Sequence, residues 1–148
     1  MTPFFNVEGI YTPVVTPMTA DHAVNWDALA KIVENLIDKG VHGVISGGST
    51  GENYAQTVEE RIAAALFTKD VVNGRVPLVV GTGAMMTPDS IALATAAREM
   101  GADAILLATP PYSVPTEREN ALNALAIDKA ADLPVIRYNY PGRMGVNM

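Results

Sequence analysis

The sequence predicts an α/β protein built on a parallel sheet. The first observation is that short apolar runs alternate with longer amphipathic stretches along all 148 residues. The second is that the later runs begin about 30 residues apart, which is the usual length of one strand-helix unit. The third is that each run is apolar throughout, as strands buried on both faces are. We therefore expect strands covered by helices.

The strands are predicted at five apolar runs, each bounded by turn residues or by an amphipathic stretch. They are Gly9–Val15, Gly43–Ser46, Pro77–Gly81, Ala104–Ala108 and Pro134–Tyr138.

Four helices are predicted between these strands. The first has apolar residues at the i, i+3, i+4 spacing of one helix face, and Gly40 follows it as the residue that ends the helix. The second and fourth begin with capping boxes, at Thr57 and at Thr116. For the third, Thr87 is the expected N-cap, with a proline in the first helical position after it.

The length leaves two architectures open. Four strand-helix units and a fifth strand fill the 148 residues, whereas a closed (β/α)8 barrel takes about 250 residues. From the pattern alone the chain is either a five-stranded open sheet or somewhat more than half of a barrel.

Composition excludes several classes of function. The net charge of −6 argues against nucleic acid as a partner, and the absence of cysteine rules out disulfides and thiolate nucleophiles. No apolar run is long enough to cross a membrane, and the N-terminus has no secretory signal pattern. A cytoplasmic protein is expected, and the residues show no metal-binding constellation.

Candidate functional residues follow the predicted strands, because the carboxyl ends of parallel strands share one edge of the sheet. Gly48, Ser49 and Thr50 offer successive backbone N–H groups and two hydroxyls for an anion, although a plain strand-to-helix turn has the same pattern. The segment from Gly81 to Gly83 is interpreted as a tight turn.

Two tyrosines and an arginine complete this edge. Tyr112 and Tyr138 could relay protons if a hydroxyl such as that of Thr50 links them, and ordinary packing is the alternative. Arg143 is either a clamp for a carboxylate or a solvated side chain.

Three motifs resemble, in order and spacing, the dihydrodipicolinate synthase and N-acetylneuraminate lyase family of pyruvate-dependent class I aldolases. They are Gly48-Ser49-Thr50-Gly51-Glu52, Pro110-Pro111-Tyr112 and Tyr138-Asn139-Tyr140-Pro141-Gly142-Arg143-Met144-Gly145. The resemblance implies that residues 1–148 are the N-terminal part of a single (β/α)8 barrel domain. It also implies a homo-oligomer, a dimer of dimers in the family, that acts on pyruvate and an aldehyde through a lysine Schiff base without another cofactor.

The resemblance also implies roles for the candidate residues. Gly48, Ser49 and Thr50 would hold the carboxylate of pyruvate. Tyr138 would be the general acid and base, in a relay with Thr50 and with Tyr112, whose counterpart is often supplied across the dimer interface. Arg143 would meet a carboxylate of the second substrate in the synthase members.

This chain departs from the family pattern at three places. Met144 stands where Thr or Ser is usual, and Arg137 replaces an apolar residue, with its side chain expected to face the helices. The lysines all fall on predicted helices: Lys31, Lys39, Lys69 and Lys129.

The lysine positions lead to the expectation of a fragment that lacks the Schiff-base lysine and has no turnover alone. Within the family the sequence leans toward a synthase rather than a sialate lyase or another 2-keto acid aldolase. The alternative from another class is a small flavodoxin-like module that binds an anion.

Overall fold

The computed structural model describes residues 5–147. Residues 1–4 and 148 of the predicted domain lie outside this range. The strands are β1 (Tyr11–Pro13), β2 (Gly43–Ser46), β3 (Leu78–Gly81), β4 (Ala104–Ala108) and β5 (Val135–Tyr138). The α-helices are α1 (Trp26–Asp38), α2 (Val58–Val72), α3 (Thr87–Glu99), α4 (Glu117–Ala131) and α5 (Pro141–Met144). Two single turns of 3₁₀-helix, η1 (Ser49–Gly51) and η2 (Asn53–Ala55), separate β2 from α2.

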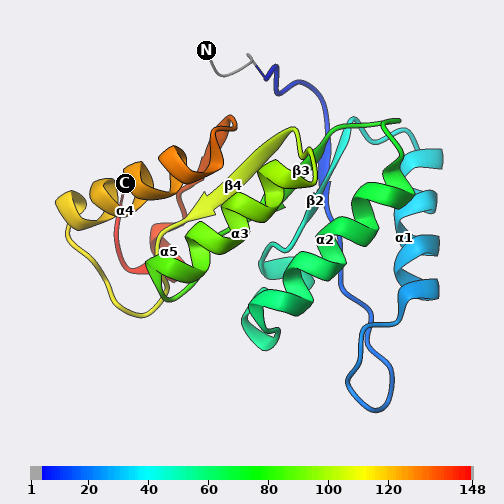
Figure 1. Ribbon diagram of the computed structural model, residues 1–148, viewed down its shortest axis with the longest axis horizontal. Helices are drawn as coiled ribbons and strands as arrows, with labels where there is room; N and C mark the ends of the chain where they lie inside the picture. The colour runs from blue at the N-terminus through cyan, green and yellow to red at the C-terminus, as the bar shows by residue number, and fades with distance from the viewer. Residues whose placement is uncertain (1–4, 148) are drawn as a thin grey trace.

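The five strands form one parallel sheet in the order β1-β2-β3-β4-β5. Because each strand lies beside the next one in sequence and such crossovers are right-handed, α1 to α4 pack against the same face of the sheet. Figure 1 shows α2 and α3 in front of the strands, with α1 beside α2 and α4 beside α3. The result is an incomplete (β/α)8 barrel, hereafter the half-barrel, which agrees with the family resemblance, whereas the apolar pattern alone also allows an open sheet.

The strands differ from the predicted ranges where glycine or proline stands at an end. The strand predicted at Gly9–Val15 is reduced to the three residues of β1, and at its N-terminal end Gly9 has φ +88° and cannot continue an extended ladder. Pro77 and Pro134 lie just outside β3 and β5 since proline has no N–H, but their carbonyls still accept from Val44 and Ile105. The short helix α5 is not predicted.

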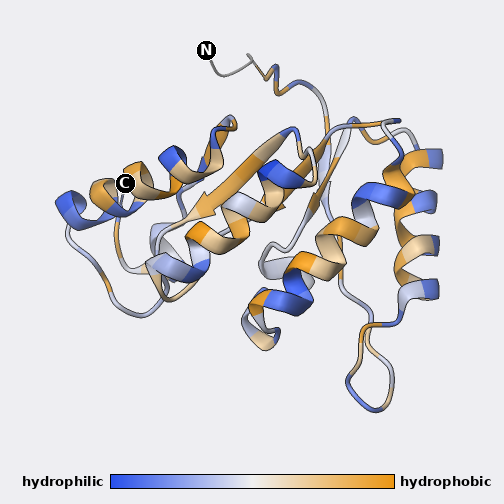
Figure 2. Ribbon diagram, viewed as in Figure 1, coloured by the Kyte–Doolittle hydropathy of each residue, from blue (hydrophilic) through white to orange (hydrophobic). Residues whose placement is uncertain are grey.

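The core lies between the sheet and the helices. Strand residues Val44, Leu78, Val80, Ile105 and Leu107 are buried against helix residues of the same core. In Figure 2 α1 shows apolar colour on the side toward the rest of the molecule and polar colour on its outer side, and β4 is apolar along its length. Alternate strand residues point to the opposite, uncovered face of the sheet, where Val79 and Ala104 are buried but Ile45, Leu106 and Ile136 are only half-buried.

The predicted helix ends are confirmed with one exception. Thr57 and Thr116 form complete capping boxes, and Gly40 follows α1 with φ +80°. The prediction that Thr87 is an N-cap is wrong. Helix α3 begins at Thr87 itself, after Met86, and the Thr87 hydroxyl donates instead to Oδ1 of Asn123 at 2.7 Å, which joins α3 to α4.

Within the part of the chain that the structure describes, no helix has the length and apolarity that a membrane crossing requires.

Candidate functional site

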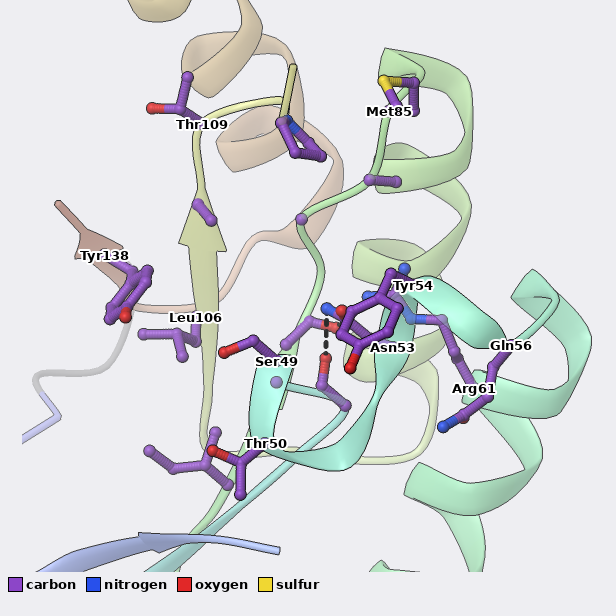
Figure 3. A pocket seen from close by; sticks show the side chains of 18 of the residues that line it. Ser49, Thr50, Asn53, Tyr54, Gln56, Arg61, Met85, Leu106, Thr109 and Tyr138 are labelled. Atoms are coloured by element: carbon purple, nitrogen blue, oxygen red, sulfur yellow. Dashed lines mark hydrogen bonds between the residues drawn. The ribbon is translucent and has the colours of Figure 1, made fainter. Parts of the chain in front are cut away.

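A pocket of about 520 Å³ lies at the carboxyl ends of the strands, where the sequence predicts the site. All five strand ends contribute to its wall, with Pro13, Ile45, Gly81, Leu106 and Tyr138 among the lining residues. Figure 3 shows the close-up, with Ser49 and Thr50 at the centre and Tyr138 on one side. The hydroxyls of both central residues point toward the side on which Tyr138 lies.

The turn after β2 presents backbone donors. Gly47 has φ +74°, which turns the chain sharply at the end of the strand, and Gly48 precedes the single turn η1. The carbonyls of Gly48 and Ser49 accept from Gly51 and Glu52 at 3.0 and 3.1 Å. Within residues 5–147, the N–H groups of Ser49 and Thr50 have no hydrogen-bond acceptor. Two backbone N–H groups of the turn predicted to bind an anion are therefore available to a ligand.

Three side chains that the sequence analysis missed surround this turn. Asn53 Nδ2 donates to the carbonyl of Gly47 at 3.0 Å, Gln56 Nε2 to that of Gly51 at 2.6 Å, and Arg61 Nη2 to that of Gly81 at 3.0 Å. In Figure 3 Gln56 and Arg61 lie beyond the turn from Tyr138. All three side chains line the pocket.

Arg61 is the most unusual of the three. It is only 5% exposed, and its Nε has no hydrogen-bond partner among the described residues. Burial lowers the pKa of its guanidinium, and the charge of nearby Asp89 acts in the opposite direction. A signal for its burial exists in the sequence, because Arg61 is in phase with Ala64, Ala65 and Thr68, the buried face of α2.

Tyr138 and Arg143 lie where the sequence predicts them. Tyr138 lines the pocket from the end of β5 and is 36% exposed, and its ring packs edge-on against Tyr140 at 6.2 Å. Arg143 also lines the pocket, with its guanidinium carbon 5.8 Å from the centre of the Tyr140 ring. Tyr140 thus supports both side chains. Met144 follows in the wall and is an apolar surface there.

Tyr112 is not brought to the pocket of this chain. It is 91% exposed and has φ +69°, in a loop fixed by the Ser113 N–H donating to the Pro111 carbonyl at 2.8 Å. Pro111 lines the pocket, whereas Tyr112 does not. No hydrogen bond joins the hydroxyls of Thr50, Tyr112 and Tyr138 in residues 5–147, so the predicted relay is not assembled within one chain.

The segment from Gly81 to Gly83 is not the tight turn that the sequence analysis predicts. Gly81 is the last residue of β3, and neither glycine has positive φ. The reason for glycine is space, since a Cβ on Gly81 would lie 2.4 Å from the Gly47 carbonyl oxygen. The buried Thr82 continues the ladder by donating its N–H to Leu106 at 3.0 Å.

The remaining charged residues agree with the sequence analysis in most respects. Arg137 lies with Glu117 and Asn120 of α4, on the helix side of β5, as strand alternation predicts. Lys31, Lys69 and Lys129 are on helices, while Lys39 is the residue after α1. None of these lysines lines the pocket.

Within the described residues no cluster of His, Asp and Glu could hold a metal ion.

Comparison with known proteins gives matches over nearly the whole chain. The model of the dihydrodipicolinate synthetase family matches residues 6–148. A 4-hydroxy-tetrahydrodipicolinate synthase of Cellvibrio japonicus is 40% identical over 96% of this chain and 49% of its own length. The chain thus spans about half the length of the curated relatives it matches.

Solved structures match equally well. Dihydrodipicolinate synthase from Acinetobacter baumannii complexed with pyruvate has a TM-score of 0.91 and 40% identity, over 96% of this chain and 49% of that one. CdNal from Clostridium difficile in complex with mannosamine has a TM-score of 0.94 and 28% identity, over 97% of this chain and 50% of that one.

Proposed function

Because the chain belongs to the dihydrodipicolinate synthetase family, we propose that it carries the pyruvate-binding part of a carbon–carbon lyase or synthase that works through a lysine Schiff base. The observation that carries this proposal is the pair of unbonded N–H groups at Ser49 and Thr50, in a pocket shared with Tyr138. A carboxylate with a ketone beside it fits this arrangement, because the ketone is then directed toward the phenol. The pyruvate complex of the related synthase supports the choice of ligand.

In the proposed complex the pyruvate carboxylate accepts hydrogen bonds from the Gly48–Thr50 turn, through the backbone N–H groups and the hydroxyls of Ser49 and Thr50. A lysine amine then attacks the ketone carbon, and water leaves as the imine forms. Tyr138 donates and accepts the protons of this exchange. Thr50 and Tyr112 assist it, with Tyr112 supplied by a second copy, since this side chain is exposed in a single chain.

The lysines of this chain do not fit the role of the amine. Each lies on a helix or directly after one, and Lys69 pairs with Asp103 at 3.8 Å. Because none of them lines the pocket, none lies beside the position proposed for the ketone. We therefore expect the 148-residue chain to bind pyruvate and to have no turnover by itself.

The second substrate is proposed to be an aldehyde that carries a carboxylate, which Arg143 would bind through its planar fork. Identity to synthases ranges from 30% to 40%, against 28% to CdNal, and this difference supports a 4-hydroxy-tetrahydrodipicolinate synthase-like reaction over an N-acetylneuraminate lyase-like one. A homo-oligomer in the cytoplasm remains our expectation for the assembled protein.

The test is a titration of the ¹⁵N-labelled chain with pyruvate, followed by borohydride treatment and intact mass. We expect saturable shifts of the Ser49 and Thr50 amide signals and no pyruvyl adduct. Ethyl pyruvate, which has the ketone but no carboxylate, is the control ligand and should leave these signals in place. A stoichiometric adduct on one lysine would contradict the expectation that no lysine of this chain is the Schiff-base amine. Unchanged amide signals would contradict the pyruvate site.

A further inference from the structure

The ends of β2 and β3 touch backbone to backbone beside the candidate carboxylate site. A Cβ on Gly81 would lie 2.4 Å from the carbonyl oxygen of Gly47 and 3.0 Å from the nitrogen of Gly48. A Cβ on Gly47 would lie 3.3 Å from the carbonyl oxygen of Gly81. Side chains are therefore excluded from this contact, and something other than packing has to fix the start of the turn.

Two side chains that follow the turn in sequence hold its start by donating hydrogen bonds to backbone carbonyls. Asn53 holds the carbonyl of Gly47 and Arg61 holds that of Gly81, each at 3.0 Å. The bond from Arg61 is buried and joins residues twenty positions apart in sequence. The carbonyls of the two glycines that meet in this contact are thus each bonded by one side chain from the segment that follows the turn.

The bonds to these carbonyls also fix the direction of the N–H groups in the same peptide planes. In a planar trans peptide the C=O of one residue and the N–H of the next point in opposite directions. The carbonyls of Gly47, Gly48 and Ser49 are all bonded within the protein, the first by Asn53 and the other two by the N–H groups of Gly51 and Glu52. The N–H groups of Gly48, Ser49 and Thr50 must therefore point away from those bonds.

We propose that Asn53, backed by Arg61, is a positioning residue that aims the N–H group of Gly48 at the bound carboxylate and so fixes the start of the turn that presents the N–H groups of Ser49 and Thr50. Asn53 supplies the one bond in this series that comes from a side chain, so it alone can be removed without changing the backbone. The inference rests on the proposed function in that pyruvate is the carboxylate. The orientation of the turn is a separate property that can be measured without ligand.

The first measurement uses no ligand and compares the variant Asn53→Leu with wild type. Leucine has nearly the same shape as asparagine but no donor. The matched control is Asn35→Leu, at an exposed position of α1. We expect changed signals and faster amide exchange confined to residues 47–51 in Asn53→Leu, with an unfolding midpoint equal to that of the control. Unchanged signals and exchange in residues 47–51 would overturn the inference.

The second measurement is the pyruvate titration of the same variants. Loss of one hydrogen bond that orients the site should weaken pyruvate binding about three- to tenfold in Asn53→Leu and leave Asn35→Leu unaffected. Wild-type affinity in Asn53→Leu would overturn the inference. If Asn53→Leu does not fold, Asn53→Ser, which is too short to reach the carbonyl, takes its place.

The two measurements separate the two proposals. If the wild-type chain shows no pyruvate binding, the proposed function fails, and the ligand-free comparison alone decides whether Asn53 orients the turn. If wild type binds and only the ligand-free arm is negative, the pyruvate site stands and the positioning role is rejected.

Discussion

At the scale of single residues, glycine is required at Gly81 because of a neighbour rather than a dihedral angle. A Cβ at this position would meet the carbonyl carbon and oxygen of Gly47 at 2.7 and 2.4 Å, and backbone atoms cannot rotate away as a side chain can. We expect Gly81→Ala to lower the free energy of unfolding by about 1–3 kcal/mol, the usual cost of overpacking a close contact. The measurement is chemical denaturation.

The control for this prediction is Gly48→Ala. An added Cβ on Gly48 would meet no atom within 4 Å, and its φ of −79° suits any residue. A small change in stability is expected here. Equal destabilisation of the two variants would show that the turn tolerates alanine poorly for a reason other than the contact between Gly47 and Gly81.

Several site residues could be predicted at this scale and others could not. Ser49, Thr50, Tyr138 and Arg143 were found because residues after parallel strands share one edge, and all of them line the pocket. The role of Asn53 escaped prediction because its bond to Gly47 depends on the path of η1 and η2. The outward direction of Tyr112 escaped as well, since it follows from a positive φ that sequence does not reveal.

At the scale of elements, the start of α4 makes stability depend on pH. The backbone N–H of Thr116 donates to the Glu119 carboxylate at 2.8 Å, and the Thr116 hydroxyl donates to it at 2.7 Å. Both bonds, the backbone one more strongly, hold the pKa of Glu119 below its ordinary value of 4.5. A carboxylate whose pKa is lowered by folding stabilises the folded state at pH values above its pKa in the unfolded state. This stability is lost as the pH falls through the pKa of the folded state.

We therefore expect Glu119→Gln to be less stable than wild type at pH 7 and to lose less stability on acidification below pH 4.5. Glutamine can still accept from Thr116 but does not titrate in this range. Thermal melts across pH 3 to 7 measure the effect, and Glu117→Gln in the same turn is the control for charge alone. The same slope in wild type and Glu119→Gln would show that this carboxylate is not responsible.

Elements were the most predictable level of the fold. Both capping boxes were found because they rely on side chains three residues apart in sequence. The error at Thr87 has a tertiary cause, because its hydroxyl bonds to Asn123 of α4, 36 positions later. The shortened β1 has a local cause that the apolar pattern conceals, namely the positive φ of Gly9.

At the scale of the whole molecule, the half-barrel has two sheet edges, at β1 and β5. The edges are not equivalent. Val14 donates its N–H to Ile45, so in a parallel ladder the preceding residue, Pro13, faces outward, where a missing N–H blocks further pairing. Ile105 donates to the carbonyl of Pro134, and the same alternation directs the N–H of Val135 toward the open edge. A strand edge that can accept a partner tends to pair with another chain, so among the described strands β5 is the edge from which we expect the 148-residue chain to self-associate.

This expectation can be tested with two substitutions at one position. Val135→Pro removes the outward N–H, while Val135→Thr keeps both that N–H and the branched side-chain shape. Each substitution takes apolar surface from a half-buried side chain, so Val135→Thr is the control for lost packing. Sedimentation velocity over a range of concentrations should show association of wild type and Val135→Thr, and monomers for Val135→Pro. If all three proteins associate alike, the chains meet through a surface other than the β5 edge. If wild type is a monomer with a cooperative melt, the half-barrel is stable alone, which is what the alternative hypothesis of a small anion-binding module requires.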